Sequence, residues 1–295
     1  MSERTERLRQ EAERLGARSF LVTNPVNVRY LTGFESSNAA LIVRTETVLL
    51  ATDGRYQEAA SAVPNVEVVA GDRSLLSFLG PRLSELAEAP VAFEADHVTV
   101  AGHDALSANG TDLLPATGVV HRLRAVKDPD ELDTIRRAAG VTDAAYEHLA
   151  RESFVGRTER ELAWRMEEIL HEEGAERPAF PVIVASGPNA ALPHHHPGDR
   201  RVERGETVIV DAGAAVDGYC SDCTRTFATG ELPEELHEAY ALCRSAQESA
   251  LAAIRAGASG REVDGVARVA IEESGLAPVL HGLGHGVGLE VHEAP

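Results

Sequence analysis

The sequence predicts an α/β domain followed by an α+β domain, and three observations support this prediction. In residues 1–124, short apolar runs alternate with segments of helical periodicity, as in a sheet covered by helices. In residues 125–295, pairs of longer amphipathic helices flank strand-like runs, as in helix pairs covering an antiparallel sheet. A basic, proline-containing junction at residues 121–129 separates the two patterns. We therefore place the domain boundary between residues 124 and 125.

The first domain opens with a predicted helix. Leu8, Ala12 and Leu15 share one face of this helix, and Gly16 is placed to end it. Short apolar runs then predict strands at residues 19–23, 39–43 and 47–51. Between the strand-like runs lie helix-like stretches, of which residues 74–87 are an example. This interleaving is the basis for the α/β prediction.

The second domain contains helices whose starts are marked by capping boxes. Asp128 is followed by Pro129 at the first helical position and by Glu131 three residues after the cap. The same spacing opens further helices at Thr158 and Ser259. Glycines are placed to end these two helices, and strand-like runs lie between the helix pairs, at residues 181–186, 207–213 and 219–227. Trp164 and Met166, within the helix that starts at Thr158, are predicted to lie in the core.

Composition excludes several classes of partner. The chain has 295 residues and 47 acidic against 28 basic side chains, giving a formal charge of -19. This charge repels phosphate backbones and anionic lipid, so neither nucleic acid nor a membrane surface is expected as a partner. No apolar run approaches the roughly 18 residues of a membrane span, no signal peptide is evident, and three cysteines form no disulfide framework. We expect a soluble cytoplasmic protein that binds a small molecule, a peptide or a cation.

A hairpin in the second domain brings two aspartates toward each other. Asp217-Gly218 is a strong signal for a two-residue turn, and counting outward from it places Asp211 opposite Thr224. Asp222 then lies on the same sheet face, diagonal to Asp211 at roughly 7 to 8 Å. Two anions this close repel each other unless a proton or cation intervenes, and such a pair can bridge divalent ions. A solvated surface pair remains the alternative, because one bulge would turn the two side chains apart.

Two histidine-bearing segments are further candidates. The glycine-rich stretch 281–293 carries His281, His285 and His292, and neutral imidazole is the commonest metal ligand in proteins. The segment 184–197, a loop with several prolines, carries His194, His195 and His196, and a histidine there could shuttle a proton or donate to an oxyanion. A glycine-rich turn and a surface histidine cluster are the alternatives. The Cys220-x-x-Cys223 spacing has no second pair, so both thiols are expected to pack in the core rather than to bind zinc.

Taken in order, these segments resemble the pita-bread metallopeptidases, in the aminopeptidase P and prolidase (Xaa-Pro dipeptidase) branch. The resemblance covers the whole chain, including a creatinase/prolidase-like first domain around residues 23–34 and 53–56 and the junction that contains Lys127. It implies a pita-bread fold for residues 125–295. It also implies an enzyme that hydrolyses the bond preceding proline, at the N-terminus of peptides or in dipeptides.

The resemblance also implies roles for particular residues. Asp211 would bind one of two divalent ions, commonly manganese, cobalt or zinc; Asp222 would bridge both ions, and His285 would bind the other. His194, His281 and His292 match histidines that line the cleft or contact the substrate or the tetrahedral intermediate. A proline-containing peptide is the implied partner, and a homodimer is the implied assembly.

One departure from the family pattern is expected to matter. The family takes two further glutamate ligands from later motifs, and this sequence reaches Pro295 before either of them, so we expect a fragment or a shortened chain with a weakened site. A peptide-binding pseudoenzyme or inactive fragment of the same fold is therefore the alternative function. A creatinase-like hydrolase needs no metal and would leave the aspartates unexplained, whereas the large first domain disfavours a methionine aminopeptidase.

Overall fold

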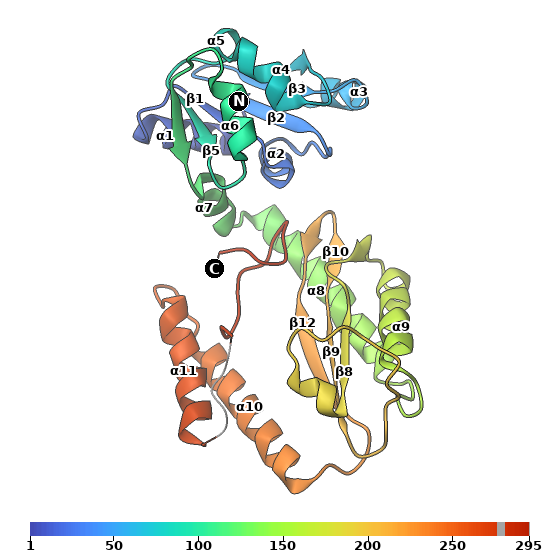
Figure 1. The fold of residues 1–295 in the computed structure, drawn as a ribbon. Coiled ribbons are helices and arrows are strands. Elements are labelled where there is room, and N and C mark those ends of the chain that lie inside the picture. The colour runs from blue at the N-terminus through green and yellow to red at the C-terminus, as the bar shows by residue number, and fades with distance from the viewer. Residues whose placement is uncertain (276–280, 295) are drawn as a thin grey trace. The chain divides into compact units, whose positions relative to one another are not determined.

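The protein, in a computed structural model that describes residues 1–275 and 281–294, divides into two compact units (Figure 1). The first unit comprises residues 1–126 and the second begins at Lys127. The boundary predicted at residue 124 falls in the last turn of helix α7 (Val119–Ala125), which closes the first unit. Among the described residues, no helix is both long and apolar enough to cross a membrane.

The first unit, all of whose residues are described, is built on a six-stranded sheet in the order β4-β3-β2-β1-β5-β6. Strand β1 pairs antiparallel with β2 and parallel with β5, so the sheet is mixed. The strands are β1 (Ser19–Val22), β2 (Ala39–Val43), β3 (Val48–Thr52), β4 (Glu67–Ala70), β5 (Val91–Glu94) and β6 (Leu113–Ala116). The helices besides α7 are α1 (Glu3–Arg14), α2 (Pro25–Thr32), α3 (Gln57–Ser61), α4 (Leu75–Leu79), η1 (Gly80–Arg82), α5 (Leu83–Leu86) and α6 (Val100–Ser107). The predicted α/β class is confirmed.

One local prediction for this unit was wrong. The helix expected over residues 74–87 is split into α4, η1 and α5, because Pro81 cannot donate a backbone hydrogen bond. Gly80 also packs so closely that a Cβ there would lie 2.0 Å from the Ala105 oxygen. Leu8 and Ala12 are buried in α1, whereas Leu15 is 45% exposed because the helix ends at Arg14 and Leu15 is only its C-cap.

The second unit contains two antiparallel three-stranded sheets among its described residues, in the orders β11-β10-β7 and β12-β9-β8. Helices α8 and α9 pack on these strands (Figure 1). The strands are β7 (Arg177–Pro178), β8 (Ile183–Ser186), β9 (Thr207–Ala212), β10 (Ala214–Val216), β11 (Tyr219–Cys220) and β12 (Cys223–Ala228). The helices are α8 (Pro129–Leu149), α9 (Glu159–Glu172), η2 (Gly187–Ala191), α10 (Glu234–Ala253) and α11 (Gly260–Glu273).

The helix starts predicted for this unit are confirmed. Capping boxes form at Asp128, Thr158 and Ser259, each with the glutamate three residues later. In each box the cap side chain accepts from a backbone N–H that has no partner inside the helix, so the signal is local to a few residues. Helices α10 and α11 lie side by side and share a small apolar cluster centred on Ala246, Ala250 and Ala267 (Figure 1).

The core of the second unit lies between α8, α9 and strands β8–β10. Met166 is fully buried there, as predicted, but Trp164 is 65% exposed and its indole N–H donates to Glu168. The prediction for Trp164 was wrong because at 3.6 residues per turn the buried face of α9 carries Leu162, Met166 and Ile169. Position 164 lies on the opposite face.

This difference in burial predicts unequal costs for two truncations in one helix. Met166→Ala is expected to lower the free energy of unfolding by about 2 to 4 kcal/mol, because it removes a buried side chain and leaves a cavity. Trp164→Ala, although it removes a larger side chain, is expected to cost less than about 1 kcal/mol. Urea unfolding of both variants measures the difference, and equal losses would contradict the burial seen here.

Candidate metal centre and histidine loop

The hairpin that carries the two aspartates has the predicted register. Val216 faces Tyr219 in the pair of β10 and β11, and Asp211 faces Thr224 in the pair of β9 and β12. The Thr224 hydroxyl donates to Oδ1 of Asp211 at 2.7 Å. The register predicted from the Asp217-Gly218 turn is therefore confirmed both beside the turn and in the pair of β9 and β12.

The hairpin is interrupted at Gly213, directly beside Asp222. A Cβ at Gly213 would lie 1.9 Å from the Ser221 oxygen, so only glycine allows this close approach. The buried Ser221 hydroxyl lies 2.7 Å from that of Thr142 on α8, and both hydroxyls are within hydrogen-bond distance of the Ala214 N–H. This buried contact holds the backbone that precedes Asp222 against α8.

Asp222 lies close to two histidines from the glycine-rich segment. Oδ2 of Asp222 is 3.3 Å from Nε2 of His285, and the rings of His285 and His292 are 4.2 Å apart between centroids. One potential ligand atom from each of the three residues lies within 4.8 Å of the other two. Side chains from two distant parts of the sequence thus converge on one point.

The electrostatics of this cluster favour a cation. Burial raises the pKa of Asp222, and the negative charge of Asp211 raises it further, while His285 and His292 oppose the shift. A positive ion would relieve both the desolvation and the repulsion between the carboxylates. The donor set of carboxylate oxygens and imidazole nitrogens suits divalent manganese, cobalt or zinc. The residues present therefore fit a divalent metal.

The segment that carries His285 is held by backbone pairing and by one ion pair. Gly286 and Glu293 exchange hydrogen bonds of 3.0 and 2.9 Å, and the Cys220 N–H donates to the Gly288 oxygen at 2.7 Å. The Glu293 carboxylate pairs with Lys127 at 2.9 Å, with both side chains largely buried. These contacts tie the segment to β11 and to Lys127, two residues before α8.

The other two candidate histidines are not among the convergent ligands found in the described residues. The His281 backbone oxygen accepts from Arg268 on α11, and its Nδ1 lies 2.7 Å from the Gly282 oxygen. His194 is exposed in the loop after η2. Their roles toward a substrate remain predictions. Both thiols of the C-x-x-C spacing are free and pack in or against the core, as expected.

A buried carboxylate beside the histidine loop was not predicted from the sequence. Glu159, the first residue of α9, has a fully buried side chain whose Oε2 lies 2.7 Å from Nε2 of His195. Its other oxygen accepts hydrogen bonds from Ser186 and Asn189. An acidic residue in the first turn of a helix is ordinarily a solvated partner of the helix dipole, so no local signal marked this residue.

The carboxylate of Glu159 predicts a pH-dependent contribution to stability. Burial alone would raise its pKa, but hydrogen bonds from Asn189, His195 and Ser186 lower it from 4.5 to about 2. Because the folded value lies below the unfolded one, the stabilisation is complete above about pH 4.5 and is lost as the pH falls toward 2. Urea unfolding should give a large gap between the parent and Glu159→Gln near pH 6 and a smaller gap near pH 3. A constant gap would contradict this prediction.

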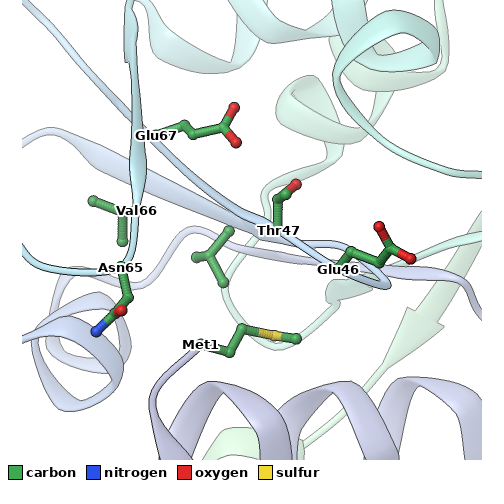
Figure 2. Close-up of a pocket in the computed structure, with 7 residues that line it drawn as sticks. Met1, Glu46, Thr47, Asn65, Val66 and Glu67 are labelled. Atoms are coloured by element: carbon green, nitrogen blue, oxygen red, sulfur yellow. The ribbon is translucent and has the colours of Figure 1, made fainter.

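A separate shallow pocket belongs to the first unit. It lies at the turn between β2 and β3 and the start of β4, and Figure 2 shows Met1 and the carboxylates of Glu46 and Glu67 around it. None of the residues that line it is a candidate metal ligand or a candidate substrate contact. The candidate metal ligands Asp211, Asp222 and His285 all belong to the second unit.

Each of the two units matches a known domain family. Residues 4–126 match the creatinase/prolidase N-terminal domain, and residues 133–295 match metallopeptidase family M24. The chain belongs to metallopeptidase family M24. Its first unit is the N-terminal domain of the creatinase and prolidase group, and its second is the pita-bread domain. By lineage it is a metallopeptidase, as expected from the sequence.

Similar proteins of this M24 family include both dipeptidases and aminopeptidases. The chain is 33% identical over 306 residues to the Xaa-Pro dipeptidase of Pyrococcus furiosus, covering 100% of this chain and 84% of that protein. It matches the structure of the Xaa-Pro dipeptidase from Bacillus anthracis with a TM-score of 0.94 at 34% identity, covering 99% and 83% of the two chains. For the X-Pro aminopeptidase from Thermotoga maritima the TM-score is 0.85 at 34% identity, covering 97% and 84%.

Proposed function

We propose that this M24 chain carries the site for metal-dependent hydrolysis of the peptide bond that precedes proline, at the N-terminus of peptides or in dipeptides. The observation that carries the proposal is the convergence of Asp222, His285 and His292 beside Asp211. The substrate class rests on the similar proteins, which are named Xaa-Pro dipeptidase and X-Pro aminopeptidase.

The proposed metal ligands are Asp211, Asp222 and His285, which would hold two divalent ions of manganese, cobalt or zinc. Bound ions of this kind lower the pKa of a water molecule and stabilise negative charge on a carbonyl oxygen. The other proposed site residues are three histidines. His292, whose ring lies 4.2 Å from that of His285 between centroids, is proposed to exchange a proton at a ring nitrogen, and His194 and His281 are proposed to contact the peptide.

Three further properties stay predictions. A proline-containing peptide is the expected partner, a homodimer is the expected assembly, and the cytoplasm is the expected location. Size-exclusion chromatography with light scattering tests the second of these directly, because a monomeric mass at micromolar concentration would contradict it.

The proposed function is tested by measuring metal stoichiometry and hydrolysis on the same preparation. After dialysis against manganese, cobalt or zinc, bound metal is counted and the cleavage of Ala-Pro and of an Ala-Pro-Ala tripeptide is compared with that of Ala-Ala. We expect two ions per chain, cleavage only before proline, and loss of cleavage after treatment with a chelator. Peptide binding without bound metal or cleavage would contradict the proposal and identify a binding protein of the same fold.

A further inference from the structure

The loop between β8 and β9 contains the run His194-His195-His196, and its three histidines are in different environments. The side chain of His195 is 15% exposed and faces Glu159, whereas His194 and His196 are exposed. The large apolar side chain of this loop, Leu192, is 54% exposed, so its burial contributes little to holding the loop in place. Its conformation must therefore depend on polar contacts.

Those polar contacts converge on one carboxylate. Glu159 accepts five hydrogen bonds, from Ser186 N (2.8 Å), Ser186 Oγ (2.8 Å), Asn189 Nδ2 (2.9 Å), His195 Nε2 (2.7 Å) and Gly198 N (3.2 Å). The donors come from the end of β8, from η2, from the histidine run and from the far side of the loop. One side chain thus contacts both ends of the loop and its middle.

The loop and the buried charge depend on each other. A carboxylate with no exposed surface is tolerated only when its oxygens are fully hydrogen-bonded, and here all five donors come from the loop or its entry. Arg200 helps to hold Ser186, one of the donors to Glu159. Its guanidinium donates to the Ser186 hydroxyl at 2.7 Å and is paired with Glu206 at 2.6 Å. The rigid start of α9 therefore sets where the loop lies.

We propose that Glu159 is a positioning residue that fixes the loop of residues 187–198 through Asn189, His195 and Gly198, and that it thereby sets the position of His194 toward the peptide substrate. The second half of this statement rests on the proposed function, in which His194 contacts the peptide. The five hydrogen bonds of the Glu159 carboxylate go to the loop and its entry rather than to the proposed metal ligands, so Glu159 acts through the residue next to His194.

The test compares Glu159→Gln with Glu168→Gln, which makes the same chemical change at an exposed glutamate of the same helix. Glutamine at position 159 keeps the size of the side chain but offers one acceptor oxygen and presents an N–H₂ group to groups that are themselves donors. Hydrogen–deuterium exchange of the peptide that spans residues 187–198 should then accelerate by about tenfold or more, and by more than exchange in α9. Glu168→Gln should leave both segments unchanged.

Kinetics and metal content separate positioning from a merely structural role. In the manganese-loaded protein, Glu159→Gln should lower kcat for Ala-Pro by about 10- to 100-fold, because a small displacement of a group that contacts the reacting bond is costly. Bound manganese should stay equal to that of the parent. His195→Gln, which keeps an N–H donor toward Glu159, should retain more activity than His195→Ala.

Two results would overturn the proposal. If loop exchange is the same in the Glu159→Gln and Glu168→Gln variants, Glu159 does not fix the loop. If the loop loosens but kcat per bound metal stays at the parental value, Glu159 does not position His194. A parent chain that hydrolyses no peptide would instead reject the proposed function, and the exchange experiment would still decide whether Glu159 holds the loop.

Discussion

Asp222→Ala is expected to remove bound metal and to abolish hydrolysis of Ala-Pro. Asp222 is the half-buried carboxylate on which His285 and His292 converge, and we propose that it would bind the metal directly. Loss of an indirect partner of a metal already costs about 10- to 100-fold in affinity, so loss of a direct ligand should cost at least about 100-fold. Metal counting after dialysis, together with the Ala-Pro assay, measures both effects.

The control for this prediction is the neighbouring residue. Cys223→Ser changes a side chain that packs against the core and is not one of the three residues of the metal cluster. Metal content and activity should therefore stay close to those of the parent. Equal metal content in the Asp222 variant and in the parent would refute the assignment of Asp222 as a ligand.

Asp222 is also expected to lower the stability of the metal-free protein. Because burial and the charge of Asp211 raise the pKa of Asp222, the ionised carboxylate destabilises the metal-free fold at neutral pH. Asp222→Asn should therefore raise the melting temperature of the metal-free protein by about 2 to 4 °C. Adding manganese should stabilise only the parent. Such an exchange of stability for function is common at active sites.

Gly213→Ala is expected to be the most destabilising single methyl addition in the second unit. The added Cβ would lie 1.9 Å from the oxygen and 2.8 Å from the carbonyl carbon of Ser221, both of them backbone atoms that cannot rotate away. Relief requires the hairpin to separate beside Asp222. We expect a loss of about 3 kcal/mol or more in the free energy of unfolding, together with weaker metal binding.

Gly140→Ala is the matched control for this prediction. Gly140 lies inside α8, and a Cβ there would meet nothing within 4 Å. Alanine in an exposed helix interior should stabilise the protein by about 0.5 to 1 kcal/mol. Denaturant unfolding of both variants gives the comparison. If the two glycines respond alike, the close approach at Gly213 is not the feature that fixes this part of the hairpin.

Short-range patterns in this sequence predict much of the fold. The capping boxes at Asp128, Thr158 and Ser259 and the hairpin register from Asp217-Gly218 all follow from the sequence alone, and all are confirmed. Each of these features depends on groups within a few residues of one another, so the local sequence contains all the partners involved. The register then places Asp211 opposite Thr224.

Burial and long-range pairing were decided only by the tertiary structure. Trp164 was predicted to lie in the core and is exposed, whereas Glu159, at the start of a helix where acidic residues are ordinarily solvated, is fully buried. Lys127 and Glu293 lie at opposite ends of the second unit's sequence and form a largely buried pair. Whether a charged side chain can be buried depends on hydrogen-bond donors from segments that are distant in the sequence. No local pattern of residues specifies which distant donors will lie beside it. The same is true of the approach of His285 to Asp222, on which the proposed metal site depends.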